Sequence, residues 1–533
     1  MPSRGHAIIM FYITHGEEAE EAEFLRAVFA IEPQPADLPP VTDACALRLE
    51  GQETQAVGTD AALWLDPQRA CWCVLEAEER WIADHLRRGL SYGELADQVG
   101  RERDQGLKRL LGHWWRLGLL VVDDQSRWPA DMYARGPLFR ASYLIEIHLT
   151  SRCNLACRYC FANAEASGTD LSADLARRAV DLALELPGDD LTIEFSGGEP
   201  LLRLPLLEEL IVRIEERSSE RDAPVQIALQ TNGLLLDPAA CALLDAHPQV
   251  SVGISLDGPA RLNDVARVGP DGQSRHAQVE AAARQAVLRW DRQAGALAVV
   301  HSASWSEPRQ VAAYLASLGL GKIRFNPMAL LGRGSAQQQA LGISADQYLS
   351  FMAGILDYLA ETRAFEESTL EALVHNLVVR TRAYRCMRSP CGAGYDYLVV
   401  TAAGDIYPCA RFLERPDLCM GNVSDGHSLE GRYAHSESVC RMADRVVGGI
   451  AECQSCLWRH FCEGGCALAA ASNQGKLDAP DPLCEFYRGA YPLVIEHLYR
   501  HPQMVPHYFP EATAHRVGPA SVEDADLHSA PAP

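Results

Sequence analysis

Three cysteines at close spacing are the first residues of this chain whose pattern indicates chemistry. Cys153, Cys157 and Cys160 are arranged as C-x3-C-x2-C. Thiolates at this spacing can hold three irons of a [4Fe–4S] cluster and leave the fourth iron without a protein ligand. Such an open iron is a binding position for a substrate or a cofactor. A zinc loop that takes a fourth ligand, such as His148, is the alternative, and spacing alone leaves both open.

Eight more cysteines form a second region toward the C-terminus. They follow the pattern C-x4-C, x12-G-x4-C and later C-x2-C-x5-C-x3-C, with a last cysteine after seventeen more residues. Two further iron–sulfur clusters explain this layout better than zinc ribbons do. The eight residues are Cys386, Cys391, Cys409, Cys453, Cys456, Cys462, Cys466 and Cys484. The other six cysteines are expected to be buried core thiols: Cys45, Cys71, Cys73, Cys241, Cys419 and Cys440. Cys440 is also an alternative ligand for one of the clusters.

The composition limits the classes of function. A chain of 533 residues, 48% of them hydrophobic, has material for about three or four packed domains. Its net charge of −23 argues against a general nucleic-acid binder, and no apolar stretch approaches the roughly 18 residues of a membrane span. The apolar run 7–13 is predicted to be an early strand and not a signal peptide. Because closely spaced cysteines suit metal binding in a reducing compartment, we expect a cytoplasmic protein without nucleic-acid or membrane partners.

The elements that position the first cysteines follow from the hydrophobic pattern. Residues 143–326 alternate between apolar runs and segments of helical period, which predicts an α/β fold with a parallel sheet, open or partly closed into a barrel. Ligand chemistry should then lie at the C-terminal ends of the strands. The expected strands are 143–149, 191–195, 225–229, 250–256, 296–301 and 322–325, with helices between them such as 171–186 and 204–216.

A smaller unit of strands followed by three helices precedes this sheet, and it predicts a winged-helix-like domain. Ser91 and Glu94 have the spacing of a capping box that would begin the second helix. The expected elements are strands at 61–65 and 70–75, helices at 77–88, 91–99 and 101–117, and a closing strand at 119–122.

The segment around the first three cysteines resembles the radical S-adenosylmethionine (SAM) enzymes. Tyr159 lies beside the last cysteine, and family motifs follow the next three expected strands at 197–200 (GGEP), 230–233 (QTNG) and 255–259 (SLDGP). The resemblance covers roughly residues 143–333 and implies a partial (β/α)6 barrel. It also implies that one-electron reduction of the cluster cleaves SAM to a 5′-deoxyadenosyl radical, which abstracts hydrogen from a substrate.

The same resemblance implies a set of SAM contacts. Glu199 would face the ammonium group of the methionine moiety and Arg267 its carboxylate, while Asp257 is expected only to shape its turn. No catalytic base is identified. The implied cofactor-binding residues are Tyr159, Gly197, Gly198, Glu199, Asn232, Ser255 and Arg267.

The second cysteine region resembles the SPASM extension of radical SAM enzymes. The resemblance implies two auxiliary clusters, and therefore three [4Fe–4S] clusters in the chain. The inner auxiliary cluster would take Cys386, Cys391, Cys409 and Cys466, and the outer one would take Cys453, Cys456, Cys462 and Cys484.

Radical SAM enzymes with this extension mostly modify peptides or proteins. We therefore expect a maturase that installs a crosslink, a thioether or else a C–C or C–O bond, in a ribosomal peptide or a small protein subunit. An anaerobic sulfatase-maturating enzyme is the alternative, although Ala410 stands where that branch has an aspartate. A non-enzymatic iron–sulfur redox regulator is the alternative from another class. A flavodoxin or ferredoxin is the electron donor that the family implies.

The N-terminal unit resembles the recognition element of peptide-maturing enzymes, in which a leader peptide adds a strand to the sheet. A unit that only packs on the barrel is the alternative. The expected organisation is an N-terminal region at 1–127 with the peptide-binding domain at about 44–122, a radical SAM core at 138–335, a helical bridge at 336–380, a SPASM domain at 381–490, and a C-terminal helix and disordered tail at 491–533.

Overall fold

A computed structural model describes most of the chain. The described residues are 38–126, 142–186, 190–218, 221, 225–291, 294–378, 386, 391–394, 396–429, 432 and 436–508. The early strand expected at 7–13 and the tail expected to be disordered lie outside them.

Within residues 38–126, the N-terminal unit contains two small antiparallel sheets and three α-helices. One sheet has the order β2-β3-β4, from β2 (Gln52–Val57), β3 (Ala61–Asp66) and β4 (Cys71–Glu76). The other has the order β5-β1-β6-β7, from β1 (Ala46–Leu49), β5 (Leu90–Ser91), β6 (Leu120–Val122) and β7 (Gln125–Ser126). The helices are α3 (Ala77–Leu86), α4 (Tyr92–Val99) and α5 (Asp104–Leu117). The capping box of Ser91 and Glu94 is confirmed at the start of α4.

A nine-stranded sheet forms the centre of the molecule, in the order β14-β13-β12-β11-β10-β9-β8-β15-β16. Six consecutive strands pair in parallel, so the predicted α/β fold with a parallel sheet is confirmed. They are β8 (Ser142–Thr150), β9 (Asp190–Gly197), β10 (Val225–Thr231), β11 (Val250–Ser255), β12 (Ala294–Val300) and β13 (Lys322–Pro327). The connecting helices are α6 (Ala173–Leu184), α7 (Leu204–Ser218), α8 (Pro238–Ala246), α9 (Ala260–Asn263), α10 (His276–Trp290) and α11 (Pro308–Ser317).

The two faces of this sheet differ in chemistry. Side chains alternate along a strand, and Ile145, Ile147 and Phe195 are fully buried in the main apolar core. Glu146 and Glu194 lie between them in sequence and therefore project from the opposite face. Parallel sheets are usually apolar on both faces, so a polar face marks the side that is available for ligand chemistry.

Three short strands join the sheet from outside the predicted barrel. The expected helical bridge is interrupted, because β14 (Glu366–Glu367) pairs with β13 between α14 (Ala345–Thr362) and α15 (Ser368–Val378). In the cysteine-rich region, β15 (Tyr397–Val400) pairs in parallel with β8, and β16 (Ile406–Tyr407) pairs with β15. The cysteine-rich lobe is therefore built directly onto the edge of the sheet that holds β8.

The remaining elements are short, apart from one long helix. The α-helices are α12 (Arg333–Ala336), α13 (Gln338–Leu341), α17 (Glu437–Ala443), α18 (Arg459–Cys462), α19 (Ala467–Gln474), α20 (Cys484–Arg500) and α21 (Val505–Tyr508). The 3-10 helices are η1 (Arg101–Arg103), η2 (Pro200–Arg203), η4 (Ala410–Phe412), η5 (Pro416–Leu418), η6 (Val447–Gly449), η7 (Ala451–Cys453) and η8 (Pro502–Met504).

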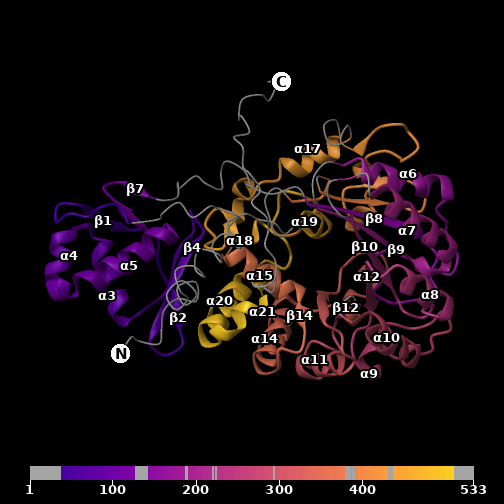
Figure 1. Ribbon diagram of the computed structural model, residues 1–533, viewed down its shortest axis with the longest axis horizontal. Helices are drawn as coiled ribbons and strands as arrows, with labels where there is room; N and C mark the ends of the chain where they lie inside the picture. The colour runs from indigo at the N-terminus through magenta and orange to yellow at the C-terminus, as the bar shows by residue number, and fades with distance from the viewer. Residues whose placement is uncertain are drawn as a thin grey trace.

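The N-terminal unit and the large sheet lie at opposite ends of the molecule, with α15, α18 and α20 between them (Figure 1). Trp72 of β4 donates from Nε1 to the Leu377 carbonyl of α15 at 2.8 Å. One continuous apolar core includes residues of both ends. Within the described part of the chain, no helix has the length and apolarity needed to cross a membrane.

Replacing Phe325 with alanine tests the packing between the sheet and its helices. The ring is fully buried and lies 5.2 Å from Phe351 and 6.3 Å from Phe365, centroid to centroid. We expect Phe325→Ala to lower the free energy of unfolding by about 3–5 kcal/mol in denaturant titration, because it leaves a cavity. Leu288→Ala, at a side chain that is 87% exposed, should change it by less than about 0.5 kcal/mol. Equal effects of the two changes would contradict this packing.

Candidate functional site

The loop that follows β8 carries the three closely spaced cysteines at the C-terminal edge of the sheet. Its backbone is held along its length: the Cys153 N–H donates to the Glu165 carbonyl at 2.6 Å, and the Arg158 N–H donates to the Ala266 carbonyl at 2.8 Å. The loop is thus fixed both to itself and to the segment after α9.

The three thiols lie close enough to influence one another. Burial raises the pKa of Cys153 to about 11, and the neighbouring thiols of Cys157 and Cys160 add to the rise. Two N–H groups point at the Cys153 sulfur, from the Leu155 backbone at 3.4 Å and from Asn232 Nδ2 at 3.7 Å. A thiolate at this position needs nearby positive charge, which iron ions supply.

Single-ion binding is a separate question from cluster binding. Within the described residues, no group of three or more His, Cys, Asp or Glu side chains is close enough to hold one metal ion. In a four-iron cluster each cysteine binds a different iron, so its ligands need not converge on one atom. His148, the fourth ligand considered for zinc, instead donates from Nε2 to Glu146 at 2.8 Å.

The GGEP motif at the end of β9 packs directly against the cysteine loop. The Gly198 N–H donates to the Thr150 carbonyl at 2.8 Å, and the Glu199 N–H donates to the Arg152 carbonyl at 2.8 Å. A Cβ at Gly198 would lie 2.0 Å from the Arg152 oxygen. Only glycine fits this contact.

Glu199 connects the second and third strands of the barrel. Its carboxylate is fully buried and accepts from Thr231 Oγ1 at 2.8 Å and from the N–H groups of Asn232 at 2.8 Å and Leu201 at 3.0 Å. Burial raises its pKa. A carboxylate accepts about four hydrogen bonds, so one acceptor position is left for a ligand.

Tyr159, Asp257 and Arg267 form a buried polar chain beside the cysteines. Tyr159 Oη donates to Asp257 Oδ2 at 2.5 Å, and Arg267 Nη1 donates to Tyr159 Oη at 2.9 Å. Asp257 Oδ1 also accepts from the Val299 N–H at 2.9 Å. The expectation that Asp257 only shapes a turn is therefore wrong, because its carboxylate joins the cysteine loop to β12. Ser255 lies one position before this turn and accepts from Gln230 Nε2 at 2.9 Å.

Arg333, like Asp257, has a role at the cysteine loop that the sequence analysis did not predict. Its backbone N–H donates to the Cys160 carbonyl at 3.0 Å, and its Nε donates to the Cys157 carbonyl at 3.0 Å. The preceding Gly332 has a φ of +55°, and a Cβ there would lie 2.5 Å from the Cys160 oxygen. The glycines around Arg333 indicate a turn, but the sequence gives no sign that this turn holds the cysteine loop.

The cysteine-rich lobe brings its eight thiols together in two groups. Burial is the largest cause that raises the pKa of Cys391 and of Cys409. The neighbouring thiols of Cys386 and Cys466 raise both values further, and Cys391 also raises that of Cys409. In the second group, burial is the largest cause that raises the pKa of Cys453, Cys462 and Cys484, and the Cys456 thiol raises all three further. These influences link the thiols of Cys386, Cys391, Cys409 and Cys466 in one group, and those of Cys453, Cys456, Cys462 and Cys484 in the other.

The other cysteines divide between core and surface. Cys45, Cys71, Cys73 and Cys241 are buried, as expected. Cys419 is only partly buried, and Cys440 is exposed, so these two are not core thiols.

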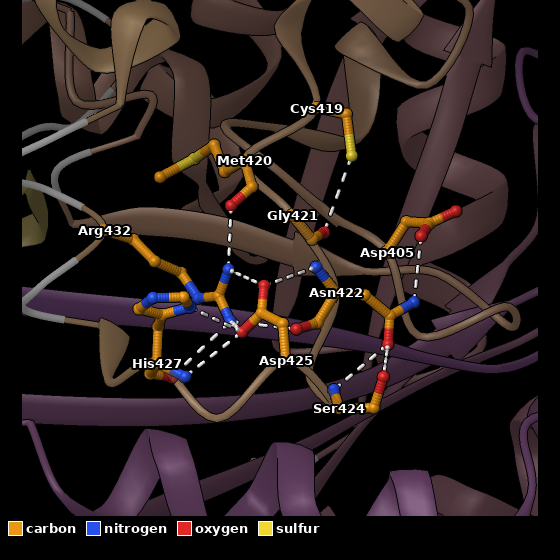
Figure 2. A network of polar contacts seen from close by, with 9 residues as sticks. All are labelled: Asp405, Cys419, Met420, Gly421, Asn422, Ser424, Asp425, His427 and Arg432. Carbon is orange, nitrogen blue, oxygen red and sulfur yellow. Dashed lines mark hydrogen bonds and ion pairs between the residues drawn. The ribbon is translucent and has the colours of Figure 1, made fainter.

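A polar network fixes the loop after Cys419 (Figure 2). The buried Arg432 donates to the Met420 carbonyl at 2.8 Å, to the Asn422 carbonyl at 2.8 Å and to Asp425 Oδ2 at 2.8 Å. Asn422 Nδ2 in turn donates to Asp405 Oδ1 at 2.9 Å. The Arg432 guanidinium holds the pKa of Asp425 well below its usual range.

Comparison with known proteins identifies the class. The Radical SAM superfamily model matches residues 147–287. The chain is 26% identical over 346 residues to the serine-type anaerobic sulfatase-maturating enzyme of Klebsiella pneumoniae, covering 60% of this chain and 81% of the relative. It is 28% identical over 341 residues to mycofactocin maturase MftC of Mycobacterium tuberculosis, covering 63% and 81%.

Two solved structures share the fold. Native anSMEcpe with bound AdoMet matches with a TM-score of 0.58 and 21% identity, over 69% of this chain and 99% of that one. Streptococcus suis SuiB bound to precursor peptide SuiA matches with a TM-score of 0.51 and 16% identity, over 84% and 99%. The chain is thus a radical SAM enzyme, which uses SAM and a [4Fe–4S] cluster. Within that class it is related to anSME, MftC and SuiB.

Gly198→Ala tests the contact between the GGEP motif and the cysteine loop. Because the new methyl group would overlap the Arg152 carbonyl, we expect the free energy of unfolding to fall by about 2–3 kcal/mol in denaturant titration. Gly106→Ala is the matched control, since nothing lies within 4 Å of its added Cβ in α5; it should be neutral or stabilising by up to about 1 kcal/mol. A Gly198→Ala protein as stable as the control would show that the contact is looser than described.

Asp425→Asn tests the network of Figure 2 through its pH dependence. A carboxyl group whose pKa is lowered by folding contributes stability above its unfolded pKa of about 3.9 and loses it as the pH falls toward the folded value. We expect a loss of about 1–2 kcal/mol at pH 7 that shrinks below about pH 4, measured by thermal unfolding. The exposed Asp444, changed to Asn, should have little effect at either pH. A pH-independent difference would rule out the ion pair as its cause.

Proposed function

We propose that this enzyme is a maturase that installs a crosslink in a ribosomal peptide or a small protein, with a thioether as the first choice and a C–C or C–O bond as the other. The observation that carries the proposal is the division of the eight lobe thiols into two groups of four. The relatives support it as well, since two of them are maturating enzymes and SuiB binds a precursor peptide.

The SAM-binding cluster would be held by Cys153, Cys157 and Cys160. The donor set fits, because the three thiols share one partly buried loop and two N–H groups point at the first sulfur. When bound, the reduced cluster supplies the electron that cleaves SAM to a 5′-deoxyadenosyl radical. The chain itself would hold the loop in place through the backbone hydrogen bonds of Cys153 and Arg158.

The residues around the cluster would bind the methionine end of SAM. Glu199 has one acceptor position left for the ammonium group, and Arg267 brings a buried positive charge for the carboxylate. Tyr159 and Asp257 hold Arg267 in place. The remaining contacts that we assign are Gly197, Gly198, Asn232 and Ser255.

The two groups of thiols in the lobe would hold the auxiliary clusters. Each group has four cysteines, so each cluster would be closed to further ligands. Arg411, directly after Ala410, brings a positive charge to the inner group. The neighbouring thiols of Cys466 and Cys409 raise the pKa of its guanidinium. Such a charge offsets the negative charge of a cluster bound there.

The N-terminal unit would bind part of the peptide substrate. β2 is an outer strand of its sheet, and its side chains are mostly exposed. A leader peptide in extended conformation could add a strand at this edge. By family analogy, the electron donor is a flavodoxin or ferredoxin of the cytoplasm.

The sulfatase-maturating alternative has support in the sequence relatives but departs at one position. Ala410 lies in η4, and its buried methyl group cannot accept a proton as the aspartate of that branch would. The regulator alternative is set aside, because the chain is an enzyme.

Replacing Cys153, Cys157 and Cys160 together with alanine tests the cluster assignments. The anaerobically reconstituted wild type should bind about twelve irons per chain, and the triple variant about eight, because only one of three four-iron clusters is lost. The variant should form no 5′-deoxyadenosine from SAM. Cys241→Ala, at a buried thiol outside the three groups, is the control and should keep both properties. A wild-type content of about four irons would discard the auxiliary clusters.

A further inference from the structure

The polar face of the sheet carries two carboxyl groups on adjacent strands. Glu146 of β8 and Glu194 of β9 are direct partners in the parallel register, so their side chains project side by side from the same face. Each lies a few residues before its strand reaches the cysteine loop or the GGEP motif. Their position places them below the SAM-binding edge, where a substrate would approach.

The two carboxyl groups have different partners. Glu146 accepts hydrogen bonds from His148 at 2.8 Å, from Ser196 at 2.5 Å and from Tyr397 of β15. These donors stabilise its charged form and hold its pKa down. Burial, together with the neighbouring Glu146 carboxylate, raises the pKa of Glu194 to about 8. At neutral pH Glu194 is therefore mostly a neutral acid that can donate a hydrogen bond.

Arg324 brings a positive charge to the same face from β13. It lies between Ile323 and Phe325, which are buried in the apolar core, and its own side chain is exposed. Arg324 Nε donates to Asn326 Oδ1 at 3.1 Å. Among the residues that the structure describes, no carboxylate lies within ion-pair distance of its guanidinium. Arginine on a sheet face without a carboxylate partner is unusual, because a fork of five donors is left largely unused.

Arg324 acts on Glu194 across this face although their strands are not neighbours. Three strands separate them in the sheet, yet the Arg324 guanidinium lowers the pKa of Glu194. Asn326 is the register partner of Val299, whose N–H donates to Asp257 in the chain beside the cysteines. The strand that carries Arg324 and Asn326 is thus linked through one strand pair to the SAM site.

We propose that Arg324, with Asn326 beside it and Glu194 across the face, binds a carboxylate of the substrate peptide. The inference rests on the proposed function and adds a substrate class, a peptide with an acidic side chain or a free C-terminus near the modified residue. A guanidinium pairs with a carboxylate through two parallel hydrogen bonds. The Asn326 amide nitrogen and the neutral Glu194 acid add donors, while Glu146 is already satisfied by its own three donors.

Binding of small carboxylates to the full chain tests the inference without turnover. The protein is reconstituted with iron and SAM under anaerobic conditions, and ligand-observed NMR measures the dissociation constants of three probes. N-acetylglutamate α-amide represents the acidic side chain, N-acetylalanine the C-terminus, and N-acetylglutamine α-amide the neutral control. We expect one of the two acids to bind at least about tenfold more tightly than the glutamine probe, and which acid does so identifies the source of the carboxylate.

Arg324→Gln should remove this preference, with a loss of about tenfold or more. Lys322→Gln is the matched control, because Lys322 lies on the same strand but pairs with Glu366 and Glu371 at 3.9 and 3.5 Å; it should change the preference by less than about twofold. Equal binding of acid and amide probes, or the same loss in both variants, would overturn the inference.

The pH dependence adds a signature that a purely structural role would lack. The charged and titratable groups that act on Glu194 are Glu146, Arg324 and Tyr397. Above pH 8 Glu194 becomes an anion and competes for Arg324, so carboxylate binding should weaken as the pH rises through about 8. Glu194→Gln should abolish that weakening, and its persistence in this variant would contradict the role of Glu194.

The outcome is separable from that of the proposed function. A chain that binds the acid probes as expected but forms no 5′-deoxyadenosine would refute the maturase alone. A chain that cleaves SAM and modifies a peptide without any preference for acids would refute this inference alone.

Discussion

The contact between the cysteine loop and the end of β9 is the constraint on which the rest of the site depends. Two backbone hydrogen bonds join Gly198 and Glu199 to the carbonyls of Thr150 and Arg152, with no room for a side chain at Gly198. The buried Glu199 carboxylate extends the connection to β10 through Thr231. A loop with three thiols has many conformations by itself, and these bonds reduce them to one that can hold a cluster.

The arrangement of the lobe follows from the same sheet. β15 adds to β8 in parallel, so the strand that ends in the SAM-binding cysteines also has the lobe strand as its neighbour. Tyr397 of β15 reaches across to Glu146 of β8, and the Cys409 thiol influences the same tyrosine. Tyr397 thus lies between the polar face and the inner group of thiols.

Much of the fold could be predicted from the sequence, because its signals are local. Apolar runs predicted the six parallel strands to within two residues at each end, and the capping box of Ser91 predicted the start of α4. The short strands β14 and β15 were missed, since two to four residues carry too little periodicity. Asp257 and Arg333 were misjudged or missed because their roles depend on partners far away in sequence. The family motifs indicated which cysteines group together. That Arg324 lacks a carboxylate partner among the described residues could not be predicted, because it depends on which side chains share its face of the folded sheet.

Magnetic coupling between SAM and the reduced cluster is the most direct test of the central claim, that one iron of the SAM-binding cluster is open to SAM. SAM labelled with 15N at the amino group and 17O at the carboxylate would be added to the dithionite-reduced protein without oxygen, followed by electron–nuclear double resonance. We expect hyperfine coupling of both labels to the cluster, because the methionine end of SAM would bind at the open iron. A cluster signal that is unchanged by labelled SAM, or a loop filled with zinc and no such signal, would contradict it.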